Sequence, residues 1–189
     1  IIQILNSSLE KKIIFPIISL FLLSFILSYI FLDHVKFRID NFLFSNIGDN
    51  YQINKSLESF SNGGLFGQGI GNGMVSKNLP DAHSDFIYAL IGEEFGFITA
   101  FLILAFYIII YVRIFIISQI TNNLFILNSL TGLGNILIFQ TIINISSSLN
   151  LLPTKGMTLP FISYGGSSII SSSLIIGFIL TLINNAKKQ

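Results

Sequence analysis

Residues 13–32, IIFPIISLFLLSFILSYIFL, decide the fold, because they form a long apolar run without a charged side chain. Twenty residues of α-helix are about 30 Å long, which matches the hydrocarbon core of a bilayer. A signal peptide would share the preceding lysines, but its apolar region is about 7 to 15 residues long and ends in a small-residue cleavage site. Residues 13–32 therefore predict a transmembrane helix that is retained.

Further apolar runs predict three more membrane spans, at about residues 86–117, 124–146 and 163–183. The run at 124–146 contains amide side chains, which favour hydrogen bonds to neighbouring helices over contact with lipid: Asn135, Gln140 and Asn144. The fold class expected is all-α, a polytopic membrane protein with four transmembrane helices. Residues 1–189 would form a single membrane domain, and the start at Ile1 suggests the C-terminal part of a longer chain.

Composition agrees with residence in a membrane. Of the 189 residues 52% are apolar and only 10% are charged, against about 25% charged residues in a typical soluble domain. A net charge of +1 leaves no basic surplus for nucleic acid. The absence of cysteine excludes disulfides and Cys-type zinc sites, and His34 lies far from His83 in the sequence. We therefore expect no metal ligands and no nucleic-acid partner.

Basic residues at the ends of the spans predict the orientation. Four spans place both ends of the chain on one side of the membrane. The short flanks on that side contain five basic residues, which the positive-inside rule assigns to the cytoplasm: Lys11, Lys12, Arg113, Lys187 and Lys188. Two extracytoplasmic loops would then face outward, at about residues 33–85 and 150–162.

The first outer loop contains a glycine-rich segment, NGGLFGQGIGNG, at residues 62–73. Its six glycines indicate tight turns or the close approach of another backbone or a ligand. The segment is neither a dinucleotide fingerprint nor a phosphate loop, because the glycine spacing and the Gly-Lys-Ser/Thr ending are missing. A flexible loop shaped by packing and a ligand-binding loop both remain possible from the sequence.

The densest ionisable cluster, LPDAHSDF, follows the glycines and contains Asp81, His83 and Asp85. One interpretation is helix capping, with Asp85 in the first turn and stabilised as an anion by the helix dipole. The other is a carboxylate at the membrane surface that acts as a general base on a hydroxyl, assisted or positioned by His83. Glu93 and Glu94, further along, either mark where the lipid-embedded helix starts or form a site inside it.

The second outer segment, LLPTKGMTLPFISYGGSS at residues 151–168, is broken by prolines and paired glycines. Broken backbone at membrane depth persists only where it is buried in protein or lines a wet cavity. The single charge of this segment, Lys155, either extends to the lipid headgroups or holds a phosphate or pyrophosphate near the outer leaflet.

These three segments, in this order and with long spans between them, resemble the C-terminal half of the SEDS family, which includes FtsW, RodA and SpoVE. The resemblance covers residues 61–183, and the lysine of LPTKGMTLP is closer to the FtsW division branch than to the RodA branch. Departures from the family pattern are mild: Asp81 stands for a frequent Glu, Ser84 for Thr and Tyr88 for Phe. None of them removes the carboxylate at Asp85.

The resemblance implies the last four spans of a ten-helix peptidoglycan glycosyltransferase that polymerises lipid II at the outer face of the bacterial inner membrane. It would work at the division septum with a class B penicillin-binding transpeptidase and other divisome membrane proteins. Asp85 would be the catalytic base, activating the acceptor hydroxyl for a single inverting displacement of the lipid pyrophosphate. Lys155, Lys77, His83 and Asp81 would bind substrate. No cofactor is expected, and the sequence does not decide whether a divalent cation accompanies the pyrophosphate.

Two other functions fit the same residues. A flippase for the lipid-linked precursor would use the broken, polar helices as a path across the membrane. A non-catalytic division scaffold would use its helices to recruit the transpeptidase. The resemblance to the SEDS family also implies that its first six spans lie outside residues 1–189, and because the family's cavity is shared between its halves we expect this part alone to be inactive.

Overall fold

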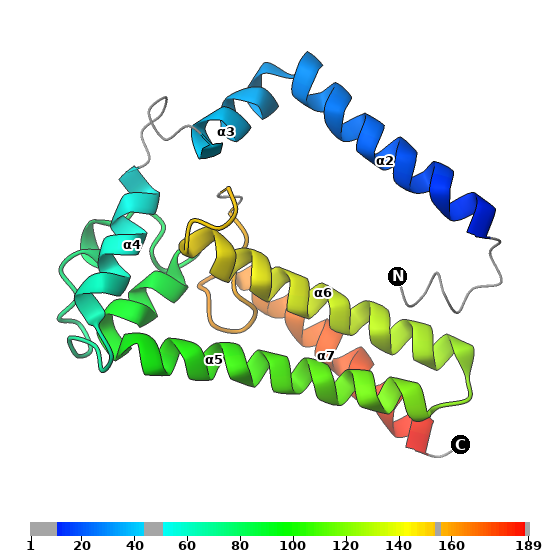
Figure 1. The fold of residues 1–189 in the computed structure, drawn as a ribbon. Coiled ribbons are helices and arrows are strands. Elements are labelled where there is room, and N and C mark those ends of the chain that lie inside the picture. Colours follow the sequence, from blue (N-terminus) through cyan, green and yellow to red (C-terminus); the bar gives the residue numbers. More distant parts are fainter. Residues whose placement is uncertain (1–10, 44–50, 154–155, 188–189) are drawn as a thin grey trace. The chain divides into compact units, whose positions relative to one another are not determined.

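The computed structural model describes residues 11–43, 51–153 and 156–187, and within those ranges every regular element is helical (Figure 1). The chain divides into two compact units, Ile1–Asn50 and Tyr51–Gln189. The predicted all-α fold is confirmed. Lys155 lies outside the described residues.

The first unit contains α2 (Lys11–Phe31) and α3 (Asp33–Leu43). The described part of α2 is apolar and exposed on all sides, as a lipid-facing helix requires. The two helices meet at a bend of 94°, measured between residues 15–31 and 33–40. The Tyr29 hydroxyl donates a hydrogen bond of 2.9 Å to Asp40 across this bend, and Asp33 lies in the first turn of α3, where a negative charge is favoured.

The second unit is built on three long helices that run side by side: α5 (Ile87–Ile120), α6 (Leu124–Ser148) and α7 (Gly166–Lys187) (Figure 1). A short connection joins α5 to α6, and Asn123 caps the second helix by accepting hydrogen bonds from the amides of Phe125 and Ile126. The buried aliphatic residues between the three helices are Ile114, Ile126, Leu130, Leu137 and Ile179.

By length and apolar composition, α5, α6 and residues 166–186 of α7 can each cross a membrane, and the bent pair α2–α3 would be a fourth span if counted as one. Large apolar side chains on the outer faces of these helices are exposed, among them Phe101, Phe139 and Phe178. Such faces are stable in contact with lipid, so the chain is a multi-pass membrane protein. The predicted spans at 86–117, 124–146 and 163–183 overlap these three helices.

The segment treated as one outer loop, residues 33–85, contains helices that the sequence analysis missed. Besides α3 it holds α4 (Tyr51–Gly63) and the short 3₁₀ helix η1 (Ser76–Asn78). The fully buried positions of α4 are Ser56, Ser59 and Gly63, and the partly buried Phe60 of the same helix packs against the apolar core that includes Tyr88. Ser56 donates a 2.7 Å hydrogen bond to the carbonyl of Ser148, which joins α4 to α6.

The glycine-rich loop completes a break in α5. Gly96 has φ 82° and ψ 174°, so the amides of Phe97 and Ile98 cannot reach the carbonyls four residues earlier. Residues 64–69 of the loop fill the gap and satisfy all four of these backbone groups. The hydrogen bonds are Gln68 N to Glu93 O and Gly69 N to Glu94 O at 2.9 Å each, Phe97 N to Gly64 O at 2.9 Å and Ile98 N to Leu65 O at 3.3 Å.

Two loop glycines are required by this close approach. A Cβ at Gly67 would lie 2.3 Å from the carbonyl oxygen of Glu94, and one at Gly63 would lie 2.0 Å from that of Gly92. Both distances are far below van der Waals contact. The interpretation that these glycines let another backbone approach is therefore confirmed, and the backbone is that of α5.

Candidate functional site

Asp85 lies in a turn that leads into α5 at the end where α4 and η1 pack. The turn is organised by Asp81, which has φ 55° and whose carbonyl accepts hydrogen bonds from the amides of Ser84, Asp85 and Phe86. The N-cap of α5 is Phe86, with no side-chain cap. The capping interpretation is therefore wrong: Asp85 precedes the cap instead of occupying the first helical turn.

The surroundings of Asp85 favour its protonated form more than water does. Partial burial and the negative charge of Asp81 raise the pKa of the Asp85 carboxyl, and a hydrogen bond from Ser84 opposes that rise. Helix-dipole stabilisation of an anion would have lowered the pKa instead. A raised pKa brings a carboxylate closer to the range in which it can accept a proton effectively near neutral pH.

The second outer segment lies against Asp85. A Cβ built on Gly156, which has φ 62°, would be 3.2 Å from Oδ2 of Asp85. Two segments separated by some seventy residues of sequence therefore meet at the carboxylate. Lys155 is the chain neighbour of Gly156, although its own position lies outside the described residues.

A polar cavity of about 570 Å³ lies beside this turn. Its lining includes three of the predicted substrate-binding residues, namely Lys77 from η1 together with Asp81 and His83 from the turn. The polar lining also includes Ser76, Ser84, Glu94 and Tyr164, none of which the sequence analysis assigned to substrate binding. The structure thus brings Lys77, Asp81 and His83 together around one opening.

Asp85 does not itself line this cavity. It lies next to it in the chain, because the two preceding residues, His83 and Ser84, are part of the lining. His83 and Tyr164 also border a second opening of about 480 Å³, and the amide of Tyr164 donates a 2.8 Å hydrogen bond to the carbonyl of His83. The turn is therefore open on two sides.

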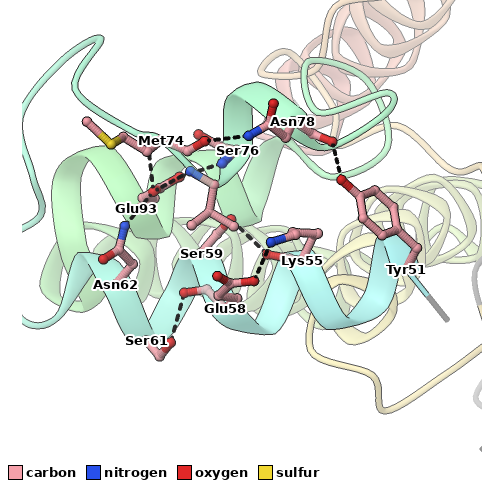
Figure 2. Close-up of polar contacts among 11 residues, drawn as sticks. Tyr51, Lys55, Glu58, Ser59, Ser61, Asn62, Met74, Ser76, Asn78 and Glu93 are labelled. Atoms are coloured by element: carbon pink, nitrogen blue, oxygen red, sulfur yellow. Dashed lines mark hydrogen bonds and ion pairs between the residues drawn. The ribbon is translucent and has the colours of Figure 1, made fainter.

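Glu93 holds the loop that leads into η1 (Figure 2). Its side chain is fully buried, and its Oε1 accepts hydrogen bonds from Asn62 Nδ2, Met74 N and Val75 N at 2.8, 3.1 and 3.0 Å. Its Oε2 accepts one from Ser76 N at 2.7 Å. The carboxylate is an internal anchor, a role that neither sequence interpretation considered.

A third cavity, of about 380 Å³, lies among α5, α6, α7 and residues 160–162. Its lining contains apolar residues and two tyrosines but no acidic, basic or histidine side chain. Acidic, basic and histidine side chains therefore line the polar cavity and not this one. In the described ranges, no three His, Asp or Glu side chains are grouped so as to hold a metal ion, and no metal ligand is assigned.

Comparison with known proteins identifies the family. The family model for FtsW, RodA and SpoVE, described as "Cell cycle protein", matches residues 1–188. A relative from Caulobacter vibrioides, named "Probable peptidoglycan glycosyltransferase FtsW", is 40% identical over 82% of this chain and 40% of its own length. A relative of the same name from Buchnera aphidicola (subsp. Acyrthosiphon pisum) is 46% identical over 71% of this chain and 35% of its own.

Solved structures share the fold. A chain of a peptidoglycan synthase complex that coordinates polymerization and crosslinking has a TM-score of 0.70 at 24% identity, over 95% of this chain and 50% of that one. The rod shape determining protein RodA of Thermus thermophilus has a TM-score of 0.54 at 25% identity, over 80% of this chain and 48% of that one. The chain spans two fifths or less of the curated relatives described above. It belongs to the FtsW/RodA/SpoVE family of cell cycle proteins.

Proposed function

We propose that residues 1–189 form the C-terminal part of a peptidoglycan glycosyltransferase that polymerises lipid II into glycan strands. The observation that carries the proposal is the meeting of Asp85, Gly156 and the cavity lined by Lys77 and His83 at one end of the helix bundle. Relatives named as FtsW peptidoglycan glycosyltransferases support the same reaction. The first six spans of the family would complete the site.

In the proposed reaction Asp85 is the general base. Its carboxylate takes the proton from the acceptor sugar hydroxyl as that oxygen forms a bond to C1 of the donor sugar. The bond from C1 to the pyrophosphate oxygen breaks on the opposite face, and the lipid pyrophosphate leaves with the electron pair and with inversion at C1. The raised pKa of Asp85 supports this role, because a more basic carboxylate accepts the proton more readily.

The remaining site residues would bind the two substrates. We assign Lys77 and Lys155 to the pyrophosphate, since ammonium groups bind its oxygens through charge-assisted hydrogen bonds. His83 and Asp81, which share the cavity with Lys77, would contact the sugars. No residue is assigned to a cofactor, and a divalent cation could accompany the pyrophosphate as part of the substrate.

The cellular setting is part of the proposal. The protein would lie in the bacterial inner membrane at the division septum, with both ends of residues 1–189 in the cytoplasm and the cavity at the outer face. Its partners would be lipid II, a class B penicillin-binding transpeptidase and divisome membrane proteins. A structural relative taken from a complex that couples polymerization to crosslinking supports a transpeptidase partner.

The test is polymerisation of labelled lipid II by the full-length protein with its transpeptidase in liposomes. Wild type should form polymer and Asp85→Asn should not, at equal membrane insertion. Glu58→Gln is the matched control, because Glu58 is an exposed carboxylate on the same outer segment that pairs with Lys55, and it should retain activity. Polymer from Asp85→Asn at the wild-type rate would refute the assignment of the base.

The liposome assay and a division assay in cells together separate the alternatives. Transfer of unjoined lipid II across the bilayer, without polymer from any variant, would indicate a flippase. Normal division in cells that carry Asp85→Asn, together with loss of division on substitution of lipid-facing helix residues, would indicate a scaffold.

A further inference from the structure

Polar residues on α6 face the outer segments. Gln140 and Asn144 are four positions apart and therefore lie on one face of the helix. Gln140 Nε2 donates a 3.2 Å hydrogen bond to the carbonyl of Thr158. Asn144 is only 1% exposed, so its amide has no access to solvent: Nδ2 makes hydrogen bonds within the protein, whereas Oδ1 has no partner among the described residues.

Asn144 joins the turn of Asp85 to the second outer segment. Its Nδ2 donates to the backbone carbonyl of Asp85 at 2.9 Å and to the carbonyl of Met157 at 2.5 Å. Met157 follows Gly156, which is the residue packed against the Asp85 carboxylate. The amide group of Asn144 thus holds both the turn of Asp85 and the second outer segment. It thereby sets the distance between the Asp85 carboxylate and the backbone of Gly156.

The two residues before Asp85 are held in the same way. The Ser163 hydroxyl donates a 2.5 Å hydrogen bond to the carbonyl of Ser84, and its oxygen accepts one from the amide of Leu159 at 2.8 Å. The amide of Tyr164 donates to the carbonyl of His83. Three consecutive carbonyls, those of residues 83, 84 and 85, therefore each receive a donor from outside the turn.

We propose that Asn144, with Ser163, positions Asp85 for catalysis. Neither side chain touches the carboxylate; each acts through the backbone of the turn that carries it. Loss of either donor leaves a carbonyl without its partner and lets the turn move relative to Gly156. A displaced catalytic group slows the chemical step, and a shift of about 1 Å can cost about 100-fold in rate. This inference rests on the proposed function of Asp85.

The test is steady-state polymerisation by the full-length protein with its transpeptidase, for Asn144→Leu and Ser163→Ala. Leucine has the branching and the number of side-chain heavy atoms of asparagine but is bulkier and has no donor. We expect kcat to fall about tenfold or more in each variant while KM for lipid II stays within about twofold, because the groups that bind substrate are unchanged. Ser163→Thr keeps the hydroxyl and should restore kcat.

Thr141→Val is the matched control. Thr141 is fully buried on the same helix, and its hydroxyl donates only to the carbonyl of Leu137 within that helix. An equal loss of kcat in Thr141→Val would show that any buried polar change on α6 slows the enzyme, and would overturn the proposal. So would a folded Asn144→Leu with wild-type kcat, or one in which only KM changes.

Folding is checked by size-exclusion chromatography of each variant. If Asn144→Leu aggregates, the comparison of Ser163→Ala with Ser163→Thr decides, and equal kcat in these two overturns the proposal. Wild type and Asp85→Asn are measured in parallel. Failure of wild type to polymerise would overturn the proposed function and this inference together, whereas an active wild type, an inactive Asp85→Asn and active positioning variants would overturn the inference alone.

Discussion

Replacing Glu93 with alanine tests how the outer loop is held next to the cavity. The substitution removes the acceptor of four hydrogen bonds, donated by Asn62, Met74, Val75 and Ser76. It leaves the backbone of α5 in place, because alanine is a good helix former. The local consequence should be opening of residues 73–78, the part of the loop that carries Lys77 into the cavity.

The size of the effect follows from the burial of the four donors. Asn62 and Met74 are exposed, so water can replace the carboxylate for them. Ser76 is buried and Val75 is half-buried, so these two amides lose an acceptor without full access to solvent. At about 1–3 kcal/mol for each unsatisfied donor, the free energy of opening the loop should fall by about 2–6 kcal/mol, which raises the opening equilibrium roughly 30-fold to 25,000-fold.

Hydrogen exchange measured by mass spectrometry on the full-length protein in detergent reads this equilibrium directly. The amides of Val75 and Ser76 should be protected in wild type and exchange at least about 30-fold faster in Glu93→Ala. Glu94→Gln is the control, because Glu94 accepts one bond from the amide of Gly71 in the same loop. Its effect should be confined to Gly71 and correspond to about 1 kcal/mol.

Unchanged exchange of Val75 and Ser76 in a folded Glu93→Ala protein would refute the reasoning, because the carboxylate would then not hold the loop. Equal acceleration at these amides in Glu94→Gln would also refute it, since the loop would then respond to any loss of charge nearby.

Three further perturbations test the site and the break in α5. Asp81→Asn removes a negative charge that raises the pKa of Asp85. Because the proposed base must be deprotonated, activity falls as the pH drops through that pKa, and the acid limb of the rate–pH profile should therefore move to lower pH in this variant. An acid limb that does not move would count against the coupling between Asp81 and Asp85. Gly96→Ala places a Cβ 2.4 Å from backbone atoms of the loop at a residue with φ 82°, and it should lower the free energy of unfolding by about 3 kcal/mol or more. The measurement is the melting temperature in detergent, and an unchanged melting temperature would argue against the inserted loop. Gly156→Ala should lower kcat by pressing on Asp85 Oδ2, whereas Gly166→Ala, with no atom within 4 Å of its Cβ, should not; equal rates in the two would show that the contact is unimportant.

The membrane helices were predictable because each is a long apolar run, and no other structure buries such a run in lipid. Helix α4 was missed because it contains no long apolar run, which is the signal that identifies the membrane helices; its fully buried residues, Ser56, Ser59 and Gly63, are small and not apolar. The break in α5 was missed for a related reason. A glycine in an apolar helix is common, and only the distant loop that supplies the missing hydrogen bonds distinguishes Gly96 from the others.

The candidate site was predictable in part. Asp81, His83 and Asp85 are close in sequence, and Lys77 is near enough that one turn of 3₁₀ helix brings it to the same cavity. The groups that hold the turn were not assigned, because Asn144 and Ser163 bind backbone carbonyls, which every residue has. The residue types therefore do not reveal which carbonyl each of these side chains binds, because that depends on the three-dimensional path of the chain.

The interruption of α5 at Gly96 has a consequence for biogenesis. The unbroken part beyond it, residues 97–120, is about 36 Å long as a helix and suffices to cross a bilayer unaided. The backbone hydrogen bonds around the break are incomplete until residues 64–69 dock. A newly inserted chain therefore exposes four unpaired backbone groups at the membrane surface, namely the carbonyls of residues 93 and 94 and the amides of residues 97 and 98. We expect docking to follow insertion, so the turn that carries Asp85 acquires its geometry late, after the protein is already in the membrane.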